Sequence, residues 1–259
     1  MNVLSLFAGI GGLELGLERA GMTVVGQVEL DPFARSVLAT HWPEVPRHDD
    51  VRTAVPWWQS RPDRPRVDVV AGGFPCQPFS TAGRRRGVAD ERWGWPWMAD
   101  VIAGLRPRVV IVENVAALLR DVEAFGWVLA DLAALGFDAD WSVLSACAVG
   151  APHTRERLFL VAHTHRVDGR AGLGAGAGGP VPGGHGGPGS WADPVDGLLA
   201  AERRSGRVVD GVPDRLEPAR VRTLGNAVVP AVAEHVGRIA LALAATPDTA
   251  PAADVTDGW

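Results

Sequence analysis

Short runs of apolar and β-branched residues alternate with longer amphipathic stretches, and this alternation constrains the fold of the chain more than any other feature. The apolar runs occupy residues 3–6, 24–28, 67–71, 109–112, 143–146 and 158–162. Stretches with the periodicity of a helix occupy residues 12–20, 31–40, 97–104, 122–135 and 231–244. Apolar runs without polar alternation are typical of parallel strands that are covered on both faces. The sequence therefore predicts an α/β fold with a doubly wound, mostly parallel sheet.

A glycine- and proline-rich tract at residues 169–189 interrupts this pattern. Such a tract cannot bury enough side chain to offset the entropy lost on ordering, so we expect it to be a flexible linker. We predict a main domain over residues 1–163, a linker with a small, loop-rich region over 164–219, and a segment over 220–245 that returns to the main domain. Residues 246–259 are expected to form a disordered tail.

The composition argues against several classes of protein. No apolar run approaches the roughly 18–20 residues of a membrane span, and the N-terminus lacks a secretion signal, so we expect a soluble, cytoplasmic protein without membrane contact. Two cysteines, Cys76 and Cys147, are too few for a disulfide framework and form no CxxC pair, so we expect no metal site. The net charge of −5 does not indicate a nucleic-acid binder, although arginines cluster at residues 84–86 and again between 203 and 222.

The segment FAGIGG at residues 7–12 joins the first predicted strand to the first predicted helix. Its glycines (Gly9, Gly11 and Gly12) allow a ligand to approach the backbone, and the helix N-terminus offers free N–H groups. An acidic residue, Glu29, follows the next strand, where a carboxylate can bind ribose hydroxyls. This pattern fits any adenosine-containing cofactor, NAD included, and a plain glycine turn is the alternative.

The segment GGFPCQPFS at residues 72–80 is more specific. It places Cys76 just past the carboxyl end of a buried strand, where open α/β sheets carry their ligands. Two flanking prolines stiffen the segment, and we expect the thiol to be exposed on a loop. Glu113 closes the strand at residues 109–112 and should reach the same edge of the sheet. A buried cysteine and a solvated glutamate are the alternatives, but together the pair is a candidate nucleophile and acid.

Two later segments are less informative by themselves. HTRERLF at residues 153–159 places Arg155 and Arg157 on one face of a strand, for which an exposed edge strand is the simpler explanation. LGNAVVP at residues 224–230 precedes the last predicted helix and can be read as a capping loop.

Taken in order, these segments resemble the motifs of the cytosine-5 DNA methyltransferases. The resemblance covers residues 3–163 and 220–244 and is carried by FAGIGG, Pro-Cys-Gln, Glu-Asn-Val, Arg-x-Arg and Gly-Asn-Ala-Val. It implies a Rossmann-like methyltransferase fold, S-adenosylmethionine as cofactor and double-stranded DNA as substrate. It also implies that residues 164–219 contain the target-recognition region, that a cognate restriction endonuclease is a possible partner, and that the protein is a monomer.

The resemblance implies a cofactor pocket, in which an aromatic ring and backbone amides surround the ligand and carboxylates bind its hydroxyl and amine groups. Its residues would be Phe7, Gly9, Gly11, Glu29, Leu30, Asp50, Val51 and Asn226. Phe7 would stack near the adenine, Glu29 would hold the ribose, and Asp50 would accept from the adenine amine. Gly9 and Gly11 would line the methionine part, and Asn226 would help to close the pocket.

The resemblance also implies a catalytic set of Cys76, Glu113, Arg155 and Arg157. Cys76 would be the nucleophile, and the positive charge of the arginines would lower its pKa. Glu113 would act at ring nitrogen N3 of the cytosine, while Arg155 and Arg157 would orient the base and the nearby phosphate. The target base would have to leave the helical stack to reach them.

Two departures from the family pattern bear on the substrate. His153 stands where the family has Gln, and the region that reads the target sequence is short and glycine-rich. Two alternatives remain open at this point: a methyltransferase of the same chemistry that acts on tRNA, and a non-catalytic nucleic-acid-binding relative.

Overall fold

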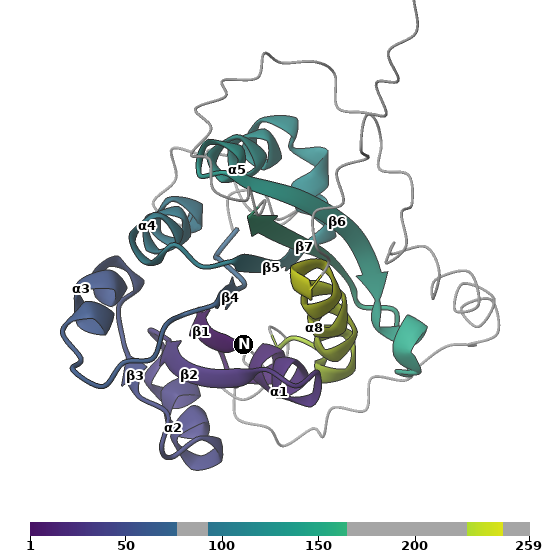
Figure 1. Cartoon of the computed structure of the whole chain (residues 1–259). Helices are drawn as coiled ribbons and strands as arrows, with labels where there is room; N and C mark the ends of the chain where they lie inside the picture. The colour runs from purple at the N-terminus through teal and green to yellow at the C-terminus, as the bar shows by residue number, and fades with distance from the viewer. Residues whose placement is uncertain (77–92, 165–226, 246–259) are drawn as a thin grey trace, which may run out of the picture.

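A computed structural model describes residues 1–76, 93–164 and 227–245 of the chain (Figure 1). The described residues form one seven-stranded sheet in the order β3-β2-β1-β4-β5-β7-β6. The strands are β1 Asn2–Leu6, β2 Thr23–Val28, β3 Arg47–His48, β4 Val69–Gly72, β5 Val109–Val115, β6 Phe137–Ser145 and β7 Glu156–Thr164. All neighbours from β3 to β5 pair in parallel, whereas β7 pairs antiparallel with both β5 and β6. The predicted doubly wound, mostly parallel fold is confirmed.

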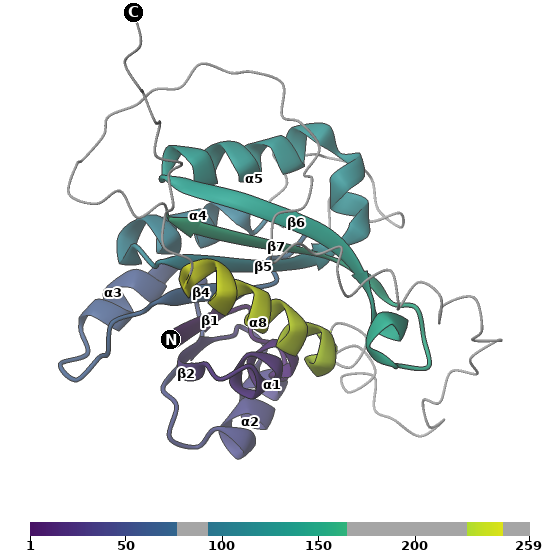
Figure 2. The same ribbon diagram turned by 45° about the vertical axis from the view of Figure 1, so that its right-hand side comes forward.

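Helices cover both faces of the sheet (Figures 1 and 2). The helices are α1 Gly12–Arg19, α2 Pro32–His41, α3 Ala54–Gln59, α4 Trp95–Leu105, α5 Val122–Ala134 and α8 Pro230–Ala245, with short 3-10 turns η1 Val51–Thr53, η4 Ala116–Arg120 and η5 Ala146–Val149.

Alternate residues of the central strands enter two separate hydrophobic clusters. Leu4 of β1 packs in the cluster that includes α3, α4 and α5, whereas Val3 packs in the cluster that includes α1 and α8. The same alternation separates Val110 from Ile111 on β5. Because both faces are buried, these strands need apolar residues at every position, which explains their unbroken apolar runs.

The two strands at one end of the sheet are longer than the sequence indicates. β6 extends over Phe137–Ser145, whereas only residues 143–146 were expected to be extended. Polar residues such as Asp138 and Asp140 alternate along this edge strand, so it lacks a continuous apolar run. β7, which follows Arg155, lies between β5 and β6, so the alternative of an exposed edge strand is wrong.

The last helix, α8, packs against the first helix, α1, and this contact depends on small residues. α8 packs against α1, where a Cβ added at Gly16 would collide with Ala233 Cβ and Pro230 O. On the other side, a Cβ added at Gly237 would lie 2.7 Å from Ala20 Cβ. The predicted boundaries of the region between the main domain and this returning segment fall at residues 164 and 219, beside or within the stretch 165–226 that lies outside the described residues. No helix in the described part of the chain is long and apolar enough to span a membrane.

One carboxyl group is enclosed between α1 and the sheet. Glu14 is fully buried, and neither of its carboxyl oxygens makes a hydrogen bond within the described residues. Burial is the main cause that raises its pKa from 4.5 to about 7. Glu29 and Glu18 add a smaller rise.

This burial predicts a pH-dependent stability. The unfolded chain loses the Glu14 proton near pH 4.5, while the folded protein keeps it until about pH 7. The folded state therefore binds more protons in this window, and the free energy of unfolding falls as the pH rises through it, by about 3 kcal/mol. Glu14→Gln should match the wild type at pH 4 and be more stable at pH 8, as measured by urea unfolding. An equal difference at both pH values would contradict the assignment.

Candidate active site

The predicted site residues gather at the carboxyl ends of neighbouring strands. The FAGIGG turn follows β1, Glu29 follows β2, and the Phe74–Cys76 segment follows β4. Glu113 does not close β5 but lies within it, directly after the residues that pair with β4. Because these strands run in parallel, their carboxyl ends share one edge of the sheet.

The turn after β1 is shaped by backbone conformations that L side chains rarely adopt. Gly9 and Gly11 have φ of 58° and 92°, and Phe7, a non-glycine residue, has φ of 54°. Gly11 is the N-cap of α1 and has no side chain that could compete with a ligand for the first amides of the helix. Strain of this kind at Phe7 is typical of ligand-binding turns.

Gly12 also has a packing role that the sequence did not indicate. A Cβ at this position would collide with the carbonyl oxygen of Val228, which precedes α8. Asn226 itself lies outside the described residues. The contact places Val228, two residues after Asn226, against the FAGIGG turn.

Glu29 joins the turn after β1 to the end of β2. Its Oε2 accepts a hydrogen bond of 2.7 Å from Gly9 N, and its Oε1 accepts one of 2.8 Å from Asp31 N. The next residue, Leu30, exposes 74% of its side chain, an unusual exposure for a large apolar group. The Glu29 carboxylate therefore holds the turn after β1 in place by hydrogen bonding, and the exposed Leu30 beside it offers an apolar surface.

Asp50 and Val51 lie at the end of β3 and start of η1. Asp50 caps η1, and its Oδ2 forms a 2.6 Å ion pair with Arg52 Nη2. Hydrogen bonds from the Arg52 side chain lower the pKa of Asp50, so it stays ionised. Any ligand amine that binds Asp50 must share this carboxylate with Arg52.

Cys76 is buried, and the expectation of an exposed thiol with a lowered pKa is wrong. Its backbone forms an isolated antiparallel bridge with Trp93, and only 8% of the residue is accessible. Burial, with a smaller contribution from the charge of Asp121, raises the pKa of the thiol to about 12. The charges of Arg157 and Arg155 lower the pKa of the neighbouring Glu113.

Glu113 and Arg157 form the charged part of the site. Glu113 Oε1 lies 3.2 Å from Arg157 Nε in an ion pair between β5 and β7. Burial raises the pKa of Glu113, and the charges of Arg157 and Arg155 offset part of that rise. A Cβ added at Gly73 would lie 2.8 Å from Glu113 Oε2, so the glycine after β4 leaves room for the carboxyl group.

Arg155 and Arg157 share one face, as the two-residue period predicts. Both line a small cavity beside α8, together with Leu144, Phe159, Val228, Val229 and Val232. Burial, and then the neighbouring Arg157, lower the pKa of Arg155. The pair therefore lies between Glu113 and the segment that leads into α8.

Asn114 is a site residue to which the sequence assigned no role. Its Nδ2 donates a 3.1 Å hydrogen bond to Phe74 O, and its Oδ1 accepts one of 2.9 Å from Val115 N. It thus ties β5 to the segment that carries Cys76. The rarity of asparagine was the available signal, since the chain has only Asn2, Asn114 and Asn226.

The family model for C-5 cytosine-specific DNA methylase matches residues 1–170. The chain belongs to this family. It is 34% identical over 169 residues to the type II methyltransferase M2.BsuMI of Bacillus subtilis, covering 62% of this chain and 42% of that protein. It is 39% identical over 167 residues to M.Eco47II of Escherichia coli, covering 62% of this chain and 39% of that protein. The chain therefore matches about half, or less, of the length of these relatives.

Two solved structures of methyltransferases share the fold of this chain. A DNA modification methyltransferase encoded within a prophage of E. coli is 27% identical, with a TM-score of 0.55 over 63% of this chain and 47% of that one. The Entamoeba histolytica methyltransferase EhMeth has a TM-score of 0.63 over 93% of this chain and 98% of that one, at 14% identity, which shows a shared fold.

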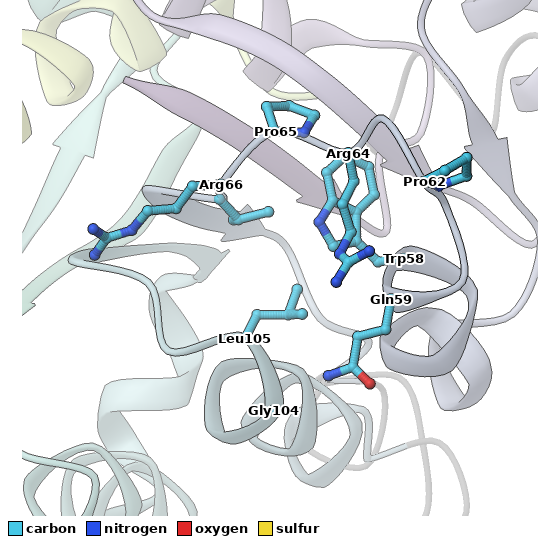
Figure 3. Close-up of a pocket in the computed structure, with 9 residues that line it drawn as sticks. Trp58, Gln59, Pro62, Arg64, Pro65, Arg66, Gly104 and Leu105 are labelled. Carbon is cyan, nitrogen blue, oxygen red and sulfur yellow. The ribbon is translucent and has the colours of Figure 1, made fainter.

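A cavity of about 410 Å³ lies away from the C-5 methylase motifs (Figure 3). It is lined by Trp58, Gln59, Pro62, Arg64, Pro65, Arg66, Val67, Gly104 and Leu105. Val67 precedes β4 and Leu105 ends α4, so the cavity opens near the amino end of β4, opposite the end that leads to Cys76. None of the predicted site residues lines it.

Proposed function

We propose that the chain transfers a methyl group from S-adenosylmethionine to carbon 5 of cytosine in double-stranded DNA, through a covalent adduct on Cys76. This proposal rests on one observation: a candidate cofactor-binding turn and a candidate nucleophile with a neighbouring acid lie at the same edge of the sheet. The turn that opens α1 follows β1, and the Glu29 carboxylate that accepts from Gly9 N follows β2. The Cys76 thiol follows β4, and the buried acid Glu113 lies in the last part of β5. Membership of the C-5 methylase family supports the same reaction.

The residues after β1, β2 and β3 fit the cofactor. The first-turn amides of α1 would bind its charged methionine part, Glu29 its ribose hydroxyls, and Asp50 its adenine amine. Phe7 and the exposed Leu30 would contact the adenine, Val51 would lie beside it, and Asn226 would complete the pocket. The bound cofactor supplies an electrophilic methyl group.

Cys76 would make carbon 5 reactive. A cytosine ring attacks a methyl donor poorly, but addition of a thiolate at carbon 6 converts it into an enamine-like nucleophile. The S–C6 bond forms as the electron pair of the C5–C6 double bond moves into the ring. Because the pKa of the Cys76 thiol is about 12, the thiol must pass its proton to solvent water as the base enters the site.

Glu113 would receive the charge that this addition creates. Its raised pKa favours a protonated carboxyl, which can donate to ring nitrogen N3. Arg157 lies close enough to hold the carboxylate after the proton has moved. After methyl transfer, solvent water accepts the proton of carbon 5, and the electrons of that C–H bond restore the C5–C6 double bond and expel the Cys76 thiolate. The proton on N3 returns to Glu113, and the demethylated cofactor is the second product.

Expression of the chain in a host that lacks cytosine methylation tests the proposal. Bisulfite sequencing of the host DNA should reveal 5-methylcytosine at a defined sequence. Methylation confined to RNA, or none in a folded protein that binds the cofactor, would overturn it. The relatives' designation as type II methyltransferases supports a further proposal, that a cognate restriction endonuclease acts in the same system.

The cofactor pocket gives a quantitative prediction. Glu29→Ala should weaken S-adenosylmethionine binding by about 1–3 kcal/mol, because ligand hydroxyls and Gly9 N both lose their acceptor. Isothermal titration calorimetry measures the change, with the exposed Glu44→Ala as the matched control. Unchanged affinity in the Glu29 variant, or binding of NAD in place of S-adenosylmethionine, would contradict the assignment.

A further inference from the structure

The residues just before and just after the segment 77–92, which lies outside the described part, pair with each other at the candidate nucleophile. Cys76 and Trp93 form an antiparallel bridge, and Gly94 N donates a 3.0 Å hydrogen bond to Pro75 O. Gly94 is also the N-cap of α4. The segment that carries Cys76 is therefore attached to the start of a helix as well as to the end of β4.

We propose that Trp93 and Gly94 are positioning residues that fix Cys76 for attack on the cytosine ring. The inference rests on the proposed function, in which Cys76 is the nucleophile. No family motif in the sequence analysis includes residues 93–95, so this role is separate from the catalytic set.

Aromatic packing makes the attachment rigid. The Phe74 ring lies 5.2 Å from the Trp93 ring at 84° and 5.4 Å from the Trp95 ring at 60°. Trp95 is almost fully buried, and its Nε1 donates a 2.7 Å hydrogen bond to Asp131 Oδ2 on α5. The segment is thus held by α4 and α5, which pack on the same face of the sheet.

Gly94 allows the close approach on which this attachment depends. A Cβ at Gly94 would lie 2.6 Å from Pro75 Cδ, 3.2 Å from Pro75 N and 3.4 Å from Phe74 Cβ. The backbone of Gly94 is right-handed helical, with φ of −84°, so alanine can adopt it without strain. Substitution would therefore act by pushing Pro75, whose ring restricts the adjustment of its own backbone.

A displacement of this kind should affect the reaction far more than binding. Nucleophilic attack requires the reacting atoms to be aligned at close range, and a shift of about 1 Å can cost about 10²-fold in rate. The cofactor residues follow β1, β2 and β3, whereas the three atoms nearest to a Cβ at Gly94 belong to Pro75 and Phe74. A positioning defect should therefore lower the rate of adduct formation and leave cofactor affinity unchanged.

The test compares Gly94→Ala with Gly126→Ala. Gly126 lies in α5, and nothing in the described structure lies within 4 Å of a Cβ added there, so it is a matched control. The readouts are S-adenosylmethionine affinity by calorimetry and the single-turnover rate of covalent adduct formation with DNA containing 5-fluorocytosine. Gly94→Ala should form the adduct about 10²-fold more slowly with unchanged affinity, and Gly126→Ala should behave as the wild type. Equal adduct rates in the two folded variants would overturn the inference.

A second pair of variants covers the case in which Gly94→Ala does not fold. Trp93→Ala removes the ring that packs on Phe74, whereas Trp93→Phe keeps an aromatic edge-to-face contact. We expect Trp93→Ala to form the adduct slowly and Trp93→Phe to regain the wild-type rate, with equal cofactor affinity in both variants. Wild-type rates in both would reject the inference. Cys76→Ser separates the two proposals, since an adduct in that variant would refute the proposed nucleophile itself.

Discussion

Cys76→Ser should reduce methyl transfer by at least about 10³-fold while S-adenosylmethionine still binds, because an alcohol is a much weaker nucleophile than a thiolate. Cys76 lies after β4, and the cofactor turn follows β1, so the substitution leaves the proposed pocket intact. The measurement is methyl incorporation into DNA, combined with trapping on DNA that contains 5-fluorocytosine. The wild type should give a covalent adduct and the serine variant none.

Cys147→Ala is the control for this experiment. Cys147 is equally buried, but it lies in η5, and not after β4 as Cys76 does. Its Sγ lies 3.0 Å from Ser145 Oγ, at the end of β6, so its loss should cost packing and leave the adduct rate unchanged. Loss of trapping in the Cys147 variant, with trapping retained in the Cys76 variant, would reverse the assignment.

Glu113→Gln should reduce the rate by about 10²-fold or more, because an amide of the same shape cannot transfer a proton to N3. The exposed Glu123→Gln, on the neighbouring helix α5, removes a similar charge outside the site and should be neutral. A Glu113 variant with wild-type turnover would show that N3 needs no acid from this position.

The same pair of variants tests the pH dependence. Burial raises the pKa of Glu113, and the reaction requires its protonated form. Wild-type activity that depends on this group should therefore fall as the pH rises through the raised pKa. The Glu113→Gln variant should lack this decline. If the activity of both proteins falls in the same way at high pH, another group must titrate.

The sequence by itself was enough to locate the strands that are buried on both faces. β1, β4 and β5 are covered on both faces, so their apolar runs revealed them, and the periodicity of residues 122–135 predicted α5 closely. The FAGIGG turn and the shared face of Arg155 and Arg157 were also predictable, because each depends on local backbone geometry. Sequence order and parallel strands together placed Cys76 and Glu113 near one edge.

Only the tertiary structure decided the environment of these groups. The pairing of Cys76 with Trp93 buries the thiol and raises its pKa, where the sequence indicated an exposed and acidic thiol. The ion pair between Glu113 and Arg157 and the packing of Gly12 on Val228 likewise join residues far apart in the chain. The pKa of a side chain depends on its desolvation and on nearby charges. Whether a position requires glycine depends on which atom would lie against an added Cβ. Both are set by long-range contacts that no local pattern encodes.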